Sequence, residues 1–259
     1  MKRLLLVGAL AWMLVGAAPA LGADMPTNLT KAPLPPPVFT WTSCYLGGHV
    51  GGGRAHKDVT DPVQLVQDSF LGAGSTVGVM TVNPGPTGAV IGGQIGCDYQ
   101  FASNFVIGVE GAASGSTMRS TRNVGLPLGN PDVALVKANT DFLPSLTARI
   151  GYAFDNVLLY ARGGAALAGD KYEFSGSFTG LPFDFNGNDN RFGWVVGGGV
   201  DWAFTPHWSV NLEYDYYRFG HGNVMMIDQI NAFSGVADVR QNVQLVKLGF
   251  NFHVWGPGW

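Results

Sequence analysis

The chain has 259 residues, of which 46% are hydrophobic and 13% charged, and this balance excludes a disordered protein. Its 38 glycines follow no Gly-X-Y period, which excludes collagen, and its formal net charge of −3 provides no basic stripe for nucleic acid. Two cysteines are too few for a disulfide scaffold or a four-thiolate zinc site.

The start of the chain resembles an export signal. A short positive region, Met1 to Arg3, precedes an apolar stretch from Leu4 to Gly16, and small residues then suit cleavage by a peptidase. The apolar stretch is short for a helical membrane span, which needs about 20 residues. We therefore predict a signal peptide over residues 1–23.

Residues 24–40 differ from both flanking regions because they are rich in proline. The prolines are Pro26, Pro33, Pro35, Pro36 and Pro37. Such a composition favours an extended segment without packed structure. We predict a periplasmic tether over residues 24–40, followed by a β-barrel over residues 41–259.

From Trp41 onward, apolar residues alternate with small or polar ones in stretches of strand length. A period of two indicates strands with two unlike faces. Ile91 and Ile95 share one face of such a strand, whereas Gln94 and Asp98 share the other. We predict eight strands, over residues 44–54, 87–101, 105–114, 142–154, 157–167, 191–204, 208–216 and 241–254.

The connections between these strands sort by length. Three tight turns, at residues 102–104, 155–156 and 205–207, alternate with four long segments, at residues 55–86, 115–139, 170–190 and 221–238. An even strand number with short turns at one end and long loops at the other is typical of outer-membrane barrels. We predict an eight-stranded antiparallel transmembrane β-barrel with short periplasmic turns and four long extracellular loops, in the outer membrane of a Gram-negative bacterium.

Aromatic residues gather near the predicted strand ends, as expected for the two girdles that mark membrane interfaces. Near the turns they are Tyr99, Phe101, Phe105, Tyr152, Phe154, Trp202, Phe204, Trp208, Phe250 and Phe252. Near the loops they are Phe142, Trp194, Tyr214, Tyr216 and Phe219.

The same alternation also fits a soluble barrel of the lipocalin type, with its apolar face turned inward around a ligand. The aromatic positions, the glycine-rich polar face and the ionisable residues in mid-strand favour the membrane barrel. Its interior would then hold a polar network. The predicted members are Gln94, Asp98, Glu110, Arg149, Arg162, Asp201, Glu213, Asp215 and Lys247.

Cys44 and Cys97 are predicted to form a disulfide at the periplasmic edge. If residues 55–86 form a loop, Arg54 pairs with Thr87, and the antiparallel register then pairs Cys44 with Cys97. The periplasm is oxidising, so the thiols can join. The alternative is two unpaired, partly buried thiols.

Four segments of this chain resemble those of the OmpA-like outer-membrane surface proteins of rhizobia, Brucella and their relatives, which are often labelled porins. The segments are Trp41–Gly51, Gly88–Gly96, Gly193–Val200 and Trp208–Tyr214, and the likeness covers residues 38–254. The resemblance implies an abundant barrel that contributes to envelope integrity and surface contact, with some members linked to haemin binding and no catalytic residues to transfer.

A catalytic, cofactor or metal site is not expected. Ser209 follows His207 but is predicted to face inward at the periplasmic end, away from any outer-leaflet substrate. His56 and His221 are loop histidines that a haemin or metal site would use. An eight-stranded interior is filled by its own side chains, so a wide pore is not expected, although inward glycines would leave narrow gaps.

We therefore expect a structural, envelope-integrity and surface-interaction role. The alternatives are a haemin-type receptor, a lipid-modifying enzyme and a minor small-solute channel. The expected partners are outer-membrane lipid and lipopolysaccharide, the barrel assembly machinery acting on the C-terminal strand, and host surfaces that the loops contact. Nucleic acid is not expected.

Overall fold

The computed structural model describes residues 39–60, 81–83, 85–125, 133–178, 180–230 and 234–254. The predicted signal peptide and most of the proline-rich segment lie outside these residues. The described part of the chain contains nine strands: β1 (Ser43–Thr60), β2 (Thr81–Val82), β3 (Thr87–Gln100), β4 (Phe105–Gly125), β5 (Val133–Phe154), β6 (Val157–Phe178), β7 (Leu181–Thr205), β8 (Trp208–Asp228) and β9 (Ser234–His253).

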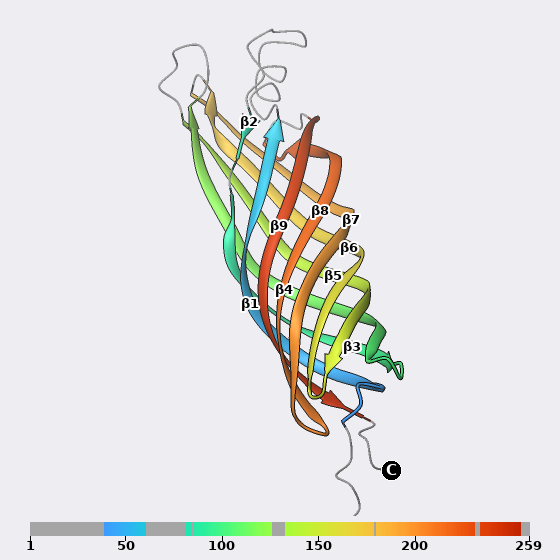
Figure 1. Cartoon of the computed structure of the whole chain (residues 1–259). Coiled ribbons are helices and arrows are strands. Elements are labelled where there is room, and N and C mark those ends of the chain that lie inside the picture. The colour runs from blue at the N-terminus through green and yellow to red at the C-terminus, as the bar shows by residue number, and fades with distance from the viewer. Residues whose placement is uncertain are drawn as a thin grey trace, which may run out of the picture. The chain divides into compact units, whose positions relative to one another are not determined.

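The eight long strands form one closed antiparallel barrel. Each long strand pairs with its neighbour in the order β1-β3-β4-β5-β6-β7-β8-β9, and β1 also pairs with β9. The short β2 extends the pairing of β1 at one end. Figure 1 shows the tilted ribbons side by side, with the β7–β8 turn and the end of β9 at the lower end. The predicted eight-stranded fold class is confirmed.

The tight turns at the lower end contain residues that accept a left-handed backbone. Asn104 has φ of 63° between β3 and β4, and Asp155 has φ of 52° between β5 and β6. Asn and Asp tolerate this conformation because their short side chains bond locally to the backbone. These two residues therefore suit the β3–β4 and β5–β6 hairpins, two of the three that were predicted.

The pairing of β1 with β3 has the predicted register. Arg54 lies opposite Thr87, Leu46 opposite Ile95 and Cys44 opposite Cys97. This register places both cysteines on the outward face, because Leu46 and Ile95 are 61% exposed.

The strands are longer than predicted, and three of the four expected loops are mostly strand. β4 continues to Gly125 and β5 starts at Val133, so most of residues 115–139 is paired. β6 and β7 pair from Phe178 and Leu181 downward, which removes the loop expected at residues 170–190. Residues 221–238 likewise belong mainly to β8 and β9.

The missed strand segments alternate in the opposite sense to the rest of the barrel. In residues 170–190 the aromatic side chains of Tyr172, Phe174 and Phe185 are buried, whereas Lys171 and Asn186 are exposed. This pattern is that of a barrel in water, with apolar residues inside and polar residues outside. The interpretation as loops was wrong because it assumed that every strand faces lipid.

The barrel is therefore taller than a membrane. β6 spans 22 residues. At about 3.3 Å per residue and a tilt of about 40°, such a strand rises roughly 55 Å, against an apolar band of about 25 Å. The upper half of the barrel projects from the outer leaflet.

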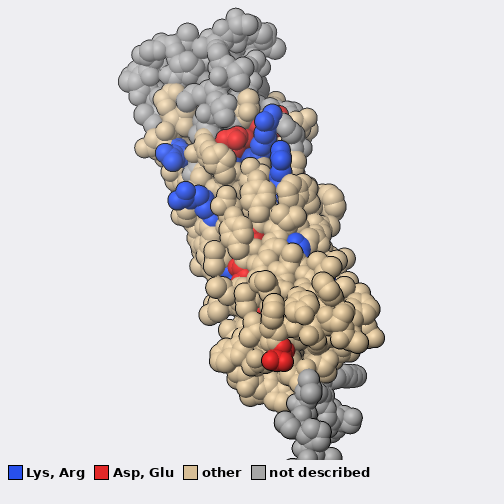
Figure 2. Space-filling model, viewed as in Figure 1, with Lys and Arg blue, Asp and Glu red and all other residues tan. Residues whose placement is uncertain are grey.

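The outer face changes from apolar to polar along the barrel. Its lower, apolar zone includes Leu46, Val50, Ile91, Ile95, Val109, Leu146, Ile150, Leu159, Val196, Val200, Leu212 and Leu248. Its upper, polar zone includes Arg54, His56, Thr87, Arg119, Thr121, Asn123, Lys171, Asn186, Asn188, Asn190, Arg218, Asn223, Arg240 and Gln244. In Figure 2, Lys and Arg gather over the upper part of the visible face, and the lower part is mostly uncharged.

The aromatic girdle at the lower end has the predicted members, all of which are exposed. At the upper interface Phe142, Trp194 and Tyr214 are exposed, but Phe219 is 2% exposed and points inward. Phe219 shares the parity of the buried Tyr217, so its place in the girdle was predicted wrongly. Phe192, which is 72% exposed, lies at this interface instead.

The described residues contain no helix that is long and apolar enough to cross a membrane.

Two arginine substitutions test the division of the outer face. Leu146→Arg places a charge in the apolar zone and is expected to lower the free energy of unfolding by about 2–4 kcal/mol. Asn186→Arg, in the polar zone, is expected to change it by less than about 0.5 kcal/mol. Urea titration in phosphatidylcholine vesicles measures both. Equal losses of unfolding free energy in the two variants would show that the two zones face the same solvent.

Candidate functional site in the barrel interior

Inward side chains fill the barrel in five successive layers, which can be followed along β6. Leu158 belongs to a lower apolar layer, Arg162 to a charged layer, Ala166 to a second apolar layer, Asp170 to a second polar layer and Phe174 to an upper apolar layer. All five residues are at most 5% exposed. The lumen is thus packed with side chains at each of these levels.

Trp41 closes the lower end. Its side chain is fully buried and packs with Val106, Ala153 and Leu158. Its indole Nε1 donates to the carbonyl oxygen of Asp155 at 3.2 Å. The residues just before β1 therefore fold into the barrel mouth, although the sequence placed the start of the barrel at this position without giving Trp41 a role.

Arg149 and Arg162 connect carboxylates from different strands in the charged layer. Arg149 donates through Nε to Asp98 Oδ1 at 2.6 Å and through Nη2 to Asp98 Oδ2. Arg162 Nη1 donates to Glu110 Oε1 at 2.5 Å and to Glu213 Oε2 at 2.9 Å. These charge-assisted bonds tie β3, β4, β5, β6 and β8 together across the lumen.

Lys247 completes this charged layer from β9. Its Nζ lies 2.6 Å from Glu213 Oε1 and 2.6 Å from Asp215 Oδ2. Asp201, which lies opposite Leu158 on β6, accepts a hydrogen bond from Asn251 at 3.4 Å. Ion pairs thus join seven of the nine residues proposed for the polar interior: Asp98, Glu110, Arg149, Arg162, Glu213, Asp215 and Lys247. The other two, Gln94 and Asp201, are linked to each other through Asn251, at 2.6 and 3.4 Å.

The sequence interpretation missed several partners of these groups. Tyr45 donates to Glu110 at 2.5 Å and Tyr160 donates to Glu213 at 2.9 Å. His49 bonds to Gln94 at 2.9 Å. The alternation along β1 contained the signal, because Tyr45 and His49 alternate with the outward Leu46 and Val50.

Inward glycines make room for the carboxylates. A Cβ atom on Gly108 would collide with the Asp98 carboxylate, and one on Gly197 would collide with that of Asp215. The space beside these glycines is therefore occupied by ion-pair partners. The gaps expected at inward glycines are filled at these two positions.

A second polar layer lies above the middle apolar layer. Lys57 Nζ is 2.8 Å from Asp170 Oδ1, and Thr140 donates to the same oxygen at 2.7 Å. Arg191 donates to the carbonyl oxygen of Val239 at 2.5 Å. Above this level Phe174, with other aromatic and aliphatic side chains, forms the upper apolar layer.

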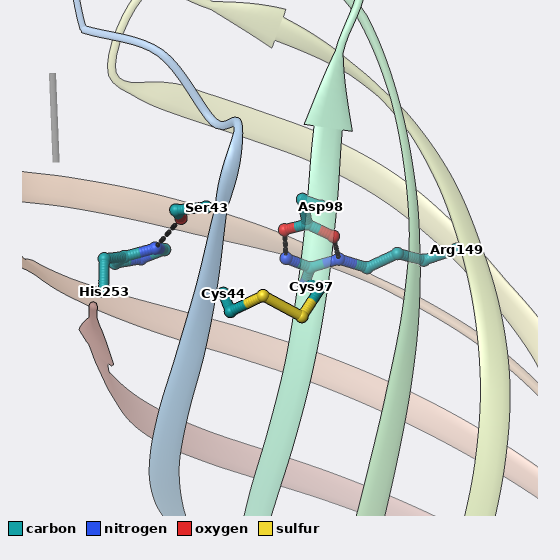
Figure 3. Close-up of a disulfide and its surroundings, with 6 residues drawn as sticks. All are labelled: Ser43, Cys44, Cys97, Asp98, Arg149 and His253. Carbon is teal, nitrogen blue, oxygen red and sulfur yellow. Dashed lines mark hydrogen bonds and ion pairs between the residues drawn. A yellow bond between two sulfur atoms is a disulfide. The ribbon is translucent and has the colours of Figure 1, made fainter. Parts of the chain in front are cut away.

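The disulfide lies at the lower rim between β1 and β3. Cys44 and Cys97 are joined, as Figure 3 shows. The adjacent residue on β3, Asp98, points to the other face of the strand and binds Arg149. β3 is thus held to β1 by the disulfide on its outward face and to β5 by an ion pair on its inward face.

The histidines are dispersed. His253 is buried between Ser43, at 2.8 Å, and Ser209, at 3.0 Å, so this serine faces inward. His56 is exposed and bonds to Asn83, while the side chain of His221 lies outside the described residues. Across the described ranges, no group of three or more His, Cys, Asp or Glu side chains is placed to hold a metal ion.

With this geometry established, comparison with known proteins gives a family. Residues 40–252 match the family described as outer membrane protein beta-barrel domain. The chain belongs to this family. As a member of the outer membrane protein beta-barrel domain family, it resides in the outer membrane of a Gram-negative bacterium.

Two relatives and one solved structure are similar to this chain. A 31 kDa outer-membrane immunogenic protein of Brucella melitensis is 27% identical over 246 residues, covering 91% of this chain and 94% of the relative. An uncharacterized protein of Coxiella burnetii is 28% identical, covering 84% and 86%. The outer membrane protease OmpT of Escherichia coli has a TM-score of 0.49 at 11% identity, covering 83% and 98%.

Two matched lysines test the energetics of the charged layer in this family member. Lys247→Met removes one of the two buried cations that Glu213 and Asp215 share, the other being Arg162, and is expected to lower the free energy of unfolding by about 3–5 kcal/mol. Lys137→Met removes an ion pair of equal length, 2.6 Å to Glu173, whose side chains are more than one-third exposed. It is expected to cost less than about 1 kcal/mol. Urea titration in vesicles measures both, and equal losses would contradict the burial argument.

The disulfide is tested by a Cys44→Ser, Cys97→Ser double variant. The bridge closes a sequence separation of 53 residues. Its removal is expected to lower the free energy of unfolding by up to about 4 kcal/mol, because the unfolded chain gains freedom. Urea titration with and without reductant provides the control. Reductant should shift the wild-type midpoint and leave that of the variant unchanged, and an unshifted wild type would contradict the crosslink.

Proposed function

We propose that this chain is a non-enzymatic, OmpA-like surface barrel that supports envelope integrity and presents its upper end to the exterior. The observation that carries this proposal is the stack of five packed layers along the interior. A barrel with this interior acts through its wall and its outer end, since the lumen offers no wide path.

The charged layer opposes a solute channel. A solute passing this level would have to separate Arg149 from Asp98 and Arg162 from Glu110 and Glu213. Breaking one such buried pair costs about 3–5 kcal/mol. Trp41 and the upper apolar layer add barriers at both ends. The minor-channel alternative is therefore less well supported than a closed barrel.

A haemin-type receptor has less support from the described side chains. His49 and His253 are 3% and 1% exposed and are bonded inside the barrel. His56 is the exposed histidine of β1 and bonds to Asn83. An enzyme role is opposed by the position of Ser209, which is fully buried against His253.

The projecting upper half supports a surface role. Its outer face carries charged and amide side chains on the long strands, well above the apolar zone. The similar Brucella melitensis protein is named for its immunogenicity, and we propose that the upper end of this chain is likewise a surface antigen. We also expect host surfaces to be met there, and the assembly machinery to recognise β9.

Planar-bilayer recording tests the closed lumen. The folded protein, verified by different gel migration with and without boiling, is expected to give no steady current in symmetrical salt. Trp41→Ala is expected to remain closed as well, because the charged and upper layers persist. A steady ohmic current from the wild type would overturn the proposal.

Haemin titration of the same sample, compared with His56→Ala, tests the receptor alternative. Saturable haemin binding that is lost in the variant would favour a receptor.

A further inference from the structure

The outer face of the barrel carries a groove at the upper membrane interface. One hollow, of about 350 Å³, is lined by Ala165, Phe192, Trp194, Arg218 and small residues of β6 to β8. A second, of about 260 Å³, shares Ala165 and Phe192 with it and continues along Leu146 and Leu167. The two hollows are therefore adjacent, and together we call them the groove, with an arginine at one end and apolar walls along the rest.

The height of the groove places Arg218 at the outer-leaflet headgroups. Arg218 is ten residues above Trp208, a member of the lower aromatic girdle on the same strand. Ten tilted residues rise about 25 Å, which is the height of the apolar band of an outer-membrane barrel. Trp194 lies directly opposite Arg218 on β7 and marks the interface itself.

Arg218 is free to bind an external anion. Its side chain is exposed and makes no hydrogen bond or ion pair with any residue in the described ranges. Two lysines of the upper outer face, Lys137 and Lys171, are by contrast neutralised by Glu173 at 2.6 Å and by Asp141 at 2.9 Å. An unpaired guanidinium beside a membrane interface suits a phosphate, which it can bind through two parallel hydrogen bonds.

The rest of the groove suits an acyl chain. Phe192 and Leu146 are 72% and 66% exposed, and Ala165 gives the floor between them its depth. Leu146, eight residues above Phe154 of the lower girdle, lies in the apolar zone below Arg218, and Phe192 lies at the upper interface. One occupant satisfies both parts of the groove, namely a molecule with a phosphate at the headgroup level and a hydrocarbon chain below it.

We propose that this groove is a binding site for a phosphorylated, acylated lipid of the outer leaflet, with the chemistry of lipid A. Arg218 binds a lipid phosphate, and Phe192, Trp194 and Ala165 hold one acyl chain. Asn242, which lies opposite Arg218 on β9, is placed to contact the same headgroup. The site deepens the proposed envelope role, on which it rests, by naming a lipid partner and its position.

The site is tested by native mass spectrometry of the full folded protein, titrated with bisphosphorylated lipid A in mild detergent. Arg218→Gln removes the phosphate contact, and Ala165→Trp fills the groove from the lipid side. A hydrogen bond to a charged group is typically worth a ten- to hundredfold change in affinity, so Arg218→Gln is expected to weaken binding by about tenfold or more. Ala165→Trp is expected to weaken it comparably.

The matched control is Arg54→Gln. Arg54 is also exposed and unpaired among the described residues, and it lies ten residues above Cys44, but on β1 and away from the groove. A general attraction to an anionic surface is worth about fivefold per basic residue. Equal losses of lipid A affinity in Arg54→Gln and Arg218→Gln would overturn the proposed site and would indicate diffuse electrostatic attraction instead. Gel migration without boiling confirms that each variant is folded.

Three further ligands distinguish the source of the phosphate. Dephosphorylated lipid A should bind at least about tenfold more weakly than the bisphosphorylated form. Inorganic phosphate and a sulfated polysaccharide should not displace lipid A. Displacement by either ligand, or unchanged binding after dephosphorylation, would overturn the proposal. Bilayer recording of the same samples reports independently on the closed lumen. A failure of the lipid A site can therefore be distinguished from a failure of the proposed envelope role.

Discussion

The bilayer core offers no partner for backbone hydrogen bonds, and the rest of this structure depends on that constraint. An open sheet in hydrocarbon would leave a row of N–H and C=O groups without partners. The barrel meets the constraint by pairing β1 with β9, from Tyr45 opposite His253 upward. Once the sheet is closed, each side chain faces either lipid or lumen, so the period of two in the sequence becomes a division between two environments.

That division reverses where the barrel leaves the membrane. Below the upper interface, Leu146 and Phe192 face outward and Arg162 faces inward. Above it, Phe174 and Phe183 face inward and Lys171 faces outward. The strands do not change their pairing at this level, so the reversal reflects only a change of solvent from lipid to water. The lower part of the sheet is thus a membrane barrel and the upper part is a barrel in water. The membrane barrel and the soluble barrel, which were weighed against each other from the sequence, each describe the outer face of one part.

The sequence could predict the features that follow from the alternation of side chains along a strand and from the register between paired strands. Pairing Arg54 with Thr87 placed Cys44 opposite Cys97, and the inward parity identified Asp98, Arg149 and Lys247 as interior residues. The extents of the strands could not be predicted, because the assumption of lipid on every outer face made residues 170–190 look like a loop. Contacts across the lumen, such as that of Tyr45 with Glu110, could not be predicted either, because they depend on which strands face each other across the closed barrel.

The interior charges explain why the barrel adopts one register rather than several. Replacing a buried ion pair by apolar side chains is often neutral or stabilising, so these pairs are weak evidence for stability as such. A slip of β5 by one residue, however, would turn Arg149 toward lipid and Ile150 into the lumen. An arginine at the membrane midplane costs about 2–4 kcal/mol, and Asp98 would lose its cation at the same time. The charged layer therefore penalises the slipped alternatives more strongly than it stabilises the native barrel, and the disulfide between β1 and β3 holds the same register at the rim.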